Sequence, residues 1–176
     1  MVETAKQAER AHLLRTAEAM AAAGRTAPKT KGMDRLETAI LTDEALEQLA
    51  AEMERIAAEQ DVAFFARDAG CVRKSGAVVL FGIDRAPRGL DQLCRCCGLE
   101  GCSDCAEKGA ACVLPQIDLG IALGSAVSVA ADARVDTRIM FSVGMAARKL
   151  GYLSDKATAV CGVPVSITGK SPFFDR

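Results

Sequence analysis

The sequence predicts one domain of the α+β class, in which helices outweigh strands. The chain has 176 residues and half of them are hydrophobic, which suits a single well-buried core. Short apolar segments typical of strands occur three times, and helical patterns separate them. This order is typical of α+β domains, with an α/β domain as the alternative. The strand segments are residues 36–41, 77–83 and 157–165.

The first half of the chain contains two helical patterns around the first strand. Residues 5–23 are rich in alanine and carry leucine and methionine at helical spacing, with Gly24 as the stop. A loop without acidic residues follows at residues 25–32. Thr42 is a suitable N-cap for a second helix, which is expected to reach about Gln60.

The second half begins with residues 61–70, which are ambiguous but allow a helix. The continuous apolar run at residues 77–83 is typical of a buried strand. Residues 118–131 are apolar nearly all round, which predicts a buried helix. A last helix is expected from Asp136, its cap, to Leu150. The helix at 118–131 also carries a stripe of small residues, which suits close packing within the chain or a dimer seam: Gly120, Gly124 and Ser128.

Composition narrows the classes of function. Lys and Arg number 22 against 23 Asp and Glu, so the net charge of −1 gives no reason to expect nucleic acid as a partner. Aromatic residues make up 4 %, too few for a base-stacking surface. The uncharged run at residues 119–131 is shorter than the ~20 residues that span a bilayer, and the N-terminus lacks an apolar signal segment. We expect a cytoplasmic protein with no nucleic-acid or membrane partner.

Cysteine is the most unusual feature of the sequence. The chain has eight cysteines, and six of them fall between Cys94 and Cys112. A secreted disulfide scaffold would be shorter and would spread its cysteines along the chain. Crowded thiolates in a reducing compartment are soft ligands that suit zinc or an iron–sulfur cluster. Residues 93–113 are therefore predicted to be a metal site embedded in the single domain, residues 1–176.

Two sets of four ligands fit this segment. Cys94, Cys97 and Cys102 are common to both, and either Cys105 or Cys112 completes the set. Paired zinc motifs usually lie about 12–20 residues apart, whereas a short loop separates Cys97 from Cys102 here. A 4Fe-4S cubane has a wider body and suits crowded cysteines in a glycine-containing loop. The spacing favours an iron–sulfur cluster over a lone zinc ion.

The opening of this segment resembles the compact 4Fe-4S domain of several redox proteins, whose pattern is CxxCGxxxC with a more distant fourth cysteine. The resemblance implies four metal ligands. Cys105 remains the alternative to Cys112 as the fourth ligand. The positions that match are Cys94, Cys97, Gly98, Cys102 and Cys112.

Nearly the whole chain resembles a prokaryotic family of uncharacterised proteins described as containing a ferredoxin domain. The stretches that carry this resemblance are RTAPKTKGMD, the cysteine segment, DLGIALGSAVS, VDTRIMFSVGMAARKLG and VPVSITGKSPFFDR. The family brings no assigned reaction.

A weaker resemblance is to the nitroreductase-like flavoproteins. It rests on the opening helix followed by RTAPKTKG, on the helix GIALGSAVSVAA, and on a late G-x-P segment with a basic stretch after it. The resemblance implies a mixed sheet with helices, with the cysteine loop as an insertion, and a homodimer that binds FMN. It implies FMN-phosphate contacts from Arg25, Lys29 and Lys31, a hydroxyl hydrogen bond from Thr26, and closure of the pocket by Lys170 or Arg176.

The function predicted from these features is an iron–sulfur redox protein, either an electron carrier or an oxidoreductase, with FMN at a dimer interface as a further expectation. The alternatives are a non-enzymatic binding module with a structural zinc site and an iron–sulfur redox sensor. A single histidine, His12, argues against hydrolase chemistry, and no catalytic residue is identified. The sequence does not decide whether the electron partner is a protein or a small molecule.

Overall fold

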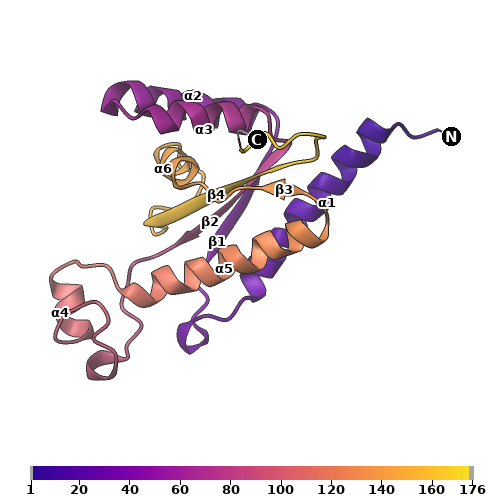
Figure 1. Ribbon diagram of the computed structural model, residues 1–176. Helices are drawn as coiled ribbons and strands as arrows, with labels where there is room; N and C mark the ends of the chain where they lie inside the picture. Colours follow the sequence, from indigo (N-terminus) through magenta and orange to yellow (C-terminus); the bar gives the residue numbers. More distant parts are fainter. Residues whose placement is uncertain (1, 175–176) are drawn as a thin grey trace.

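The computed structural model describes residues 2–174, and these form one sheet of four strands between two layers of helices (Figure 1). The strands run in the order β1-β2-β4-β3. Their bounds are Glu37–Leu41 for β1, Ala77–Ile83 for β2, Asp136–Thr137 for β3 and Ala159–Ser166 for β4. The α+β class is therefore confirmed.

The two helical layers cover opposite faces of the sheet (Figure 1). One layer contains α1 (Ala5–Thr26) and α5 (Val113–Asp132). The other contains α2 (Glu44–Gln60), α3 (Ala63–Arg73) and α6 (Phe141–Lys149). A small lobe with the short helix α4 (Cys102–Glu107) projects from one end of the body, between the end of β2 and the start of α5.

The sheet differs in one respect from the predicted mixed sheet, because each pairing among the described strands is antiparallel. The connection between β1 and β2 explains this direction. It consists of α2 and α3, which follow each other through a short turn at Asp61 and pack together as a hairpin. The hairpin returns the chain to the end of the sheet where β1 finished, so β2 runs back alongside β1.

Strand β2 is the centre of the core and is buried along its whole length. Its side chains alternate between the two faces, as the period of a strand requires. Val79 and Phe81 pack against α1 and α5, while Val78 and Leu80 pack against the layer of α2, α3 and α6. This double burial explains why the segment reads as a continuous apolar run.

The helix predicted from Asp136 is wrong at its start. Asp136 and Thr137 form β3 and pair with the end of β4, opposite Ser166 and Val165. The helix begins later, at Phe141. A β-branched threonine fits a strand edge at least as well as a helix start, and the partner strand decides between them. The helix predicted as an option for residues 61–70 is confirmed as α3.

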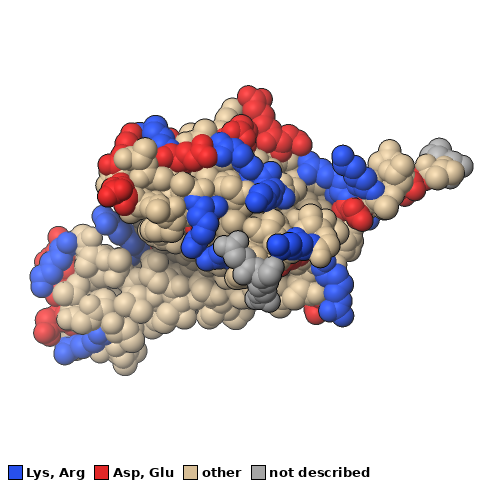
Figure 2. Space-filling view, turned by 45° about the horizontal axis from the view of Figure 1, so that its top comes forward, with Lys and Arg blue, Asp and Glu red and all other residues tan. Residues whose placement is uncertain are grey.

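Helix α5 is less buried than its apolar pattern predicts. Its inner side packs on the sheet, but Ile117 and Ile121 are exposed on the outer side, together with Gly120 and Gly124. The helix is long and apolar enough to cross a membrane by length and composition alone, and 39 % of its most apolar stretch is buried. The core helix of a globular domain passes the same test, and α5 packs against α1 and the sheet. Figure 2 shows a broad band free of charged side chains on the lower side of the molecule, while acidic side chains gather at the top.

Close packing of α6 on β4 gives the first testable prediction. A Cβ atom at Gly144 would overlap the backbone carbonyl of Val160, which belongs to the strand and cannot move aside. We expect Gly144→Ala to lower the free energy of unfolding by about 3 kcal/mol through overpacking. The matched control is Gly70→Ala in α3, where the added methyl group meets nothing within 4 Å and should stabilise the helix by about 0.5–1 kcal/mol. Urea unfolding of both variants checks this, and equal stabilities would contradict it.

Candidate metal centre

The cysteine lobe brings all six clustered thiols around one cavity. The cavity has a volume of about 20 Å³. A hydrogen bond from the Cys112 amide to the Arg85 carbonyl, 3.0 Å long, closes the base of the lobe. The lobe contains α4 and a short 3-10 helix, Asp91–Leu93. The cysteines that line the cavity are Cys94, Cys96, Cys97, Cys102, Cys105 and Cys112.

The thiols differ in burial but none forms a disulfide. Cys105 and Cys112 are buried, Cys96 is exposed, and the other three are half-buried. Burial, followed by the neighbouring thiol of Cys97, raises the pKa of the Cys105 thiol. Within residues 2–174 no group of three or more His, Cys, Asp or Glu side chains is placed to hold a metal ion. The thiols therefore share a cavity without converging on one point.

Asp91 links two parts of the lobe, a role that no pattern in the sequence indicates. Its carboxylate Oδ1 accepts a hydrogen bond from the Cys102 amide at 3.0 Å, and its own amide donates to Cys102 Sγ at 3.1 Å. A Cβ atom at Gly101 would overlap the same carboxylate oxygen, so a side chain there would displace Asp91 from Cys102. Gly98 has a φ of +76°, a conformation that other residues rarely adopt. These contacts tie Cys102 to the 3-10 helix on the opposite wall.

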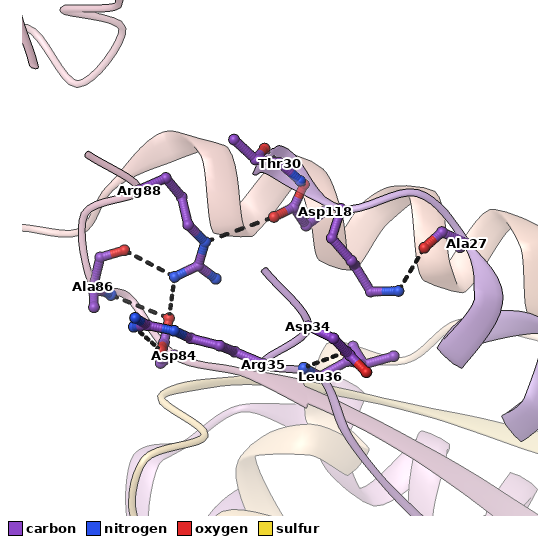
Figure 3. Close-up of polar contacts among 10 residues, drawn as sticks. Ala27, Thr30, Asp34, Arg35, Leu36, Asp84, Ala86, Arg88 and Asp118 are labelled. Carbon is purple, nitrogen blue, oxygen red and sulfur yellow. Dashed lines mark hydrogen bonds and ion pairs between the residues drawn. The ribbon is translucent and has the colours of Figure 1, made fainter. Parts of the chain in front are cut away.

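A buried arginine, Arg88, is one of the residues that line the cavity. Figure 3 shows its polar contacts. The Arg88 side chain has no exposed area. Its Nη1 donates to Asp84 Oδ1 at 2.7 Å and to the Ala86 carbonyl at 3.1 Å. Its Nε lies 3.8 Å from Asp118 Oδ2, close enough for an ion pair but too far for a hydrogen bond. Among the described residues, Arg88 Nε and Nη2 and Asp118 Oδ2 have no hydrogen-bond partner.

Asp118 links this arginine to a distant loop. Its Oδ1 accepts hydrogen bonds from the amide and the hydroxyl of Thr30, each 2.9 Å long. The sequence predicts the start of this helix at residue 118, but α5 begins at Val113 and Asp118 lies inside it, 2 % exposed. A carboxylate in the interior of an apolar helix was the available signal for a buried charge pair. Arg88 itself precedes the predicted metal site at residues 93–113, and no pattern in the sequence singles it out.

The four residues predicted to bind a flavin phosphate near the end of α1 are close together, but each has a partner within the chain. Arg25 donates to Asp34 at 2.8 Å, and the Thr26 hydroxyl donates back to the Ala22 carbonyl at 3.1 Å. The Lys29 ammonium donates to three carbonyls at the C-terminus of α1, and burial lowers its pKa. Lys31 donates to the Gly89 carbonyl at 3.2 Å, beside Arg88.

Lys170 is not brought to this cluster. It follows the end of β4, which lies beside the start of β2, since Ala77 pairs with Val165. The basic loop precedes β1, whose first residue, Glu37, pairs with Gly82 at the other end of β2. The two groups therefore occupy opposite ends of the sheet within one chain. Arg176, the other residue predicted to close the pocket, lies outside the described residues.

A larger groove of about 860 Å³ adjoins the lobe but contains none of the cysteines. It lies between the ends of the sheet strands and α4, and Pro87 is the residue it shares with the cysteine cavity. Two of its carboxylates are engaged, since Asp34 pairs with Arg25 and Asp84 pairs with Arg35. The groove gives solvent access to the lobe next to the buried arginine.

Solved structures similar to this chain define its fold class. A nitroreductase with bound FMN from Bacteroides fragilis matches with a TM-score of 0.62 and 12 % identity, covering 88 % of this chain and 77 % of that one. A nitroreductase with bound FMN from Desulfitobacterium hafniense gives 0.58 and 13 %, covering 89 % and 78 %. A putative NADH dehydrogenase/NAD(P)H nitroreductase from Bacteroides thetaiotaomicron gives 0.57 and 15 %, covering 92 % and 79 %. The protein therefore has a nitroreductase-like fold.

Sequence comparison defines the family. Residues 108–176 match the model of the family described as "Uncharacterized protein containing a ferredoxin domain (DUF2148)". An uncharacterized protein from Archaeoglobus fulgidus is 46 % identical over 165 residues, which cover 89 % of this chain and 88 % of the relative. The chain belongs to this ferredoxin-domain family. Of the six clustered cysteines, the matched segment contains Cys112.

The ion pairs of Asp84 give a pH-dependent prediction. Burial alone would raise the pKa of Asp84, but hydrogen bonds from Arg35 and Arg88 outweigh it and hold this pKa below its usual value. A lowered pKa contributes stability above the unfolded-state value of about 3.9, and this stability is lost as the pH falls through the folded-state pKa. We expect Asp84→Asn to destabilise the protein at pH 7 by about 2 kcal/mol.

The difference between wild type and Asp84→Asn should shrink as the pH falls below about 4, since the wild-type carboxyl then becomes protonated too. Unfolding curves between pH 7 and acidic pH measure it. Asp43→Asn is the control, because Asp43 pairs with Arg10 with 78 % of its side chain exposed, and its effect should be small throughout. A stability difference for Asp84→Asn that stays constant with pH would contradict the assignment.

Proposed function

We propose that the protein holds a 4Fe-4S cluster in the cysteine cavity and transfers single electrons. The observation that carries this proposal is that six thiols from one short segment line a common cavity, and that the buried, incompletely paired Arg88 belongs to the same lining. When bound, such a cluster supplies one-electron redox chemistry. The protein contributes thiolate ligands, partial burial and hydrogen-bond donors.

The donor set suits a cluster better than a single ion. Thiolates are the ligands of iron–sulfur clusters, and a cubane spreads its four sulfur ligands more widely than a zinc ion, which holds each sulfur at about 2.3 Å. A cluster with four thiolate ligands is also negatively charged, which suits a cavity with Arg88 in its wall. These features support the cluster over the structural zinc alternative.

Four cysteines are proposed as the ligands. Cys94, Cys97 and Cys102 are half-buried in the cavity wall, and Cys112 is the fourth. Cys112 occupies the N-cap of α5, where the helix dipole stabilises a thiolate, and its side chain makes no capping hydrogen bond. The rival, Cys105, has a local partner instead, because its thiol donates to the Ala110 carbonyl at 3.6 Å. A thiol that donates a hydrogen bond keeps its proton, which favours Cys112 as the ligand.

A second proposed feature is FMN at the interface of a homodimer, which would make the protein a flavin-dependent oxidoreductase. The support is the nitroreductase-like fold, since two of the similar structures contain bound FMN. The outer side of α5 also presents an apolar surface with exposed Ile117 and Ile121 and the small-residue stripe around Gly124, which suits a second copy of the chain. The proposed phosphate contacts are Arg25, Thr26, Lys29 and Lys31, whereas Lys170 lies at the opposite end of the sheet. Free cysteines suit a reducing, cytoplasmic location.

Metal analysis after anaerobic purification tests the cluster. We expect about four iron and four sulfide per chain in the wild type. Iron should fall to a small fraction of this in Cys97→Ser and Cys112→Ser, because each removes a thiolate ligand. The matched controls Cys96→Ser and Cys105→Ser remove a thiol of the same cavity and should keep the wild-type iron content. Zinc in place of iron would overturn the cluster, and loss of iron in Cys105→Ser but not in Cys112→Ser would overturn the choice of the fourth ligand.

Sedimentation and flavin titration test the second feature. The wild type is expected to be a dimer that quenches FMN fluorescence on binding. Gly124→Arg should give a monomer that no longer binds FMN but retains its iron, because Gly124 is exposed and its added side chain meets nothing within 4 Å in the chain. Gly70→Arg places the same side chain in the opposite helical layer and serves as the control. A monomeric wild type, or a wild type without FMN binding, would contradict the proposal.

A further inference from the structure

We propose that Arg88 raises the reduction potential of the group bound in the cysteine cavity through its buried positive charge. The inference rests on the proposed function, because it requires a cluster. It adds a residue that neither the cysteine pattern nor the family resemblance singles out.

The hydrogen bonding of Arg88 is incomplete in a specific way. A guanidinium has five N–H donors in a fixed plane, and burial without partners is costly. Arg88 uses Nη1 for Asp84 and Ala86, whereas Nε and Nη2 have no hydrogen-bond partner among the described residues. The side chain is fully buried and lines the same cavity as the six cysteines. Nε faces Asp118 Oδ2 at 3.8 Å (Figure 3), so what a buried side chain in the cavity lining offers an anionic group is its positive charge.

The surroundings of Arg88 hold it in place rather than neutralise it fully. Asp84 and Asp118 lie on either side of it, but Asp84 is shared with Arg35, at 2.9 Å. Asp118 is in turn shared with two donors from Thr30. Arginine keeps its charge at all ordinary pH values, so the positive charge at the cavity wall is permanent.

A permanent positive charge and N–H donors favour the reduced form of a cluster. Reduction adds one electron, and the extra negative charge is stabilised by nearby donors and cations more than the oxidised form is. Removal of Arg88 should therefore make the reduction potential more negative. A purely structural arginine, which only ties Asp84 to Asp118, would change folding stability and leave the potential unchanged.

Redox titration of the anaerobically purified full-length protein tests this. Dithionite supplies electrons in the presence of mediators, the reduced cluster is followed by its electron paramagnetic resonance, and iron and sulfide are measured in each sample. Arg88→Met should lower the equilibrium constant for reduction about tenfold, which is about 59 mV for a one-electron couple. Arg88→Lys keeps the charge but loses the planar set of donors and should give a smaller shift in the same direction.

Two further variants make the test specific. Asp118→Asn removes a negative charge beside Arg88 and keeps an oxygen for Thr30, so it should shift the potential upward. Arg35→Met removes the other partner of Asp84 from a residue that does not line the cavity, and should leave the potential within error of wild type. Where Arg88→Met holds less iron than the wild type, the potentials of Arg88→Lys and Asp118→Asn decide.

The outcomes separate this inference from the proposed function. Wild-type protein without iron overturns the cluster and this inference with it. Wild-type protein with a full cluster, together with Arg88 and Asp118 variants at the wild-type potential, overturns the role of Arg88 alone. A shift in Arg35→Met as large as that in Arg88→Met would show a general charge effect and also overturns it.

Discussion

The buried charge of Arg88 is the constraint on which the arrangement of the candidate site depends. A guanidinium without solvent contact needs carboxylate partners, and these come from distant parts of the chain. Asp84 follows β2, whereas Asp118 lies inside α5 and also holds Thr30 in the loop after α1. One buried cation thus joins the end of the central strand, the longest apolar helix and the basic loop. Loss of Arg88 would leave the buried carboxylate of Asp118 without an ion pair, so these segments are held together as a unit.

The same framework explains why an inserted lobe can have a defined position. The sheet is fixed by β2, which is buried on both faces, and by α6, which approaches β4 so closely that Gly144 has no room for a side chain. The lobe leaves this framework at Arg85 and returns at Cys112, and a hydrogen bond between these two residues closes its base. The cysteines therefore sit on a rigid support, which suits a cofactor that transfers electrons with little structural change.

The sequence predicted features that depend on residues close together in the chain. It missed features that depend on contacts between residues far apart in the chain. Strand β2 was predicted with its observed bounds, because its apolar run reflects local burial on both faces. The strand Asp136–Thr137 was predicted as a helix start, since its partner β4 lies far along the chain. The cysteine cavity was predicted by spacing alone, as all six thiols come from one segment. Arg88 and Asp91 were missed because their roles depend on contacts with Asp118 and Cys102, which no local pattern encodes.

Helix α5 connects the separate features of the protein. Its N-cap is Cys112, its interior carries Asp118, and its outer side presents the apolar surface around Gly124. A helix is stiff over this length, so the position of the cavity wall, the ion pair of Arg88 and the exposed surface are fixed relative to one another. The sequence of α5 is apolar enough for a fully buried helix, yet one side of the helix is exposed. A charged residue is tolerated on its inner side because Arg88 pairs with it, while the outer side exposes Ile117, Ile121 and Gly124. The exposed apolar surface and the carboxylate partner of the buried cation thus belong to the same twenty-residue element.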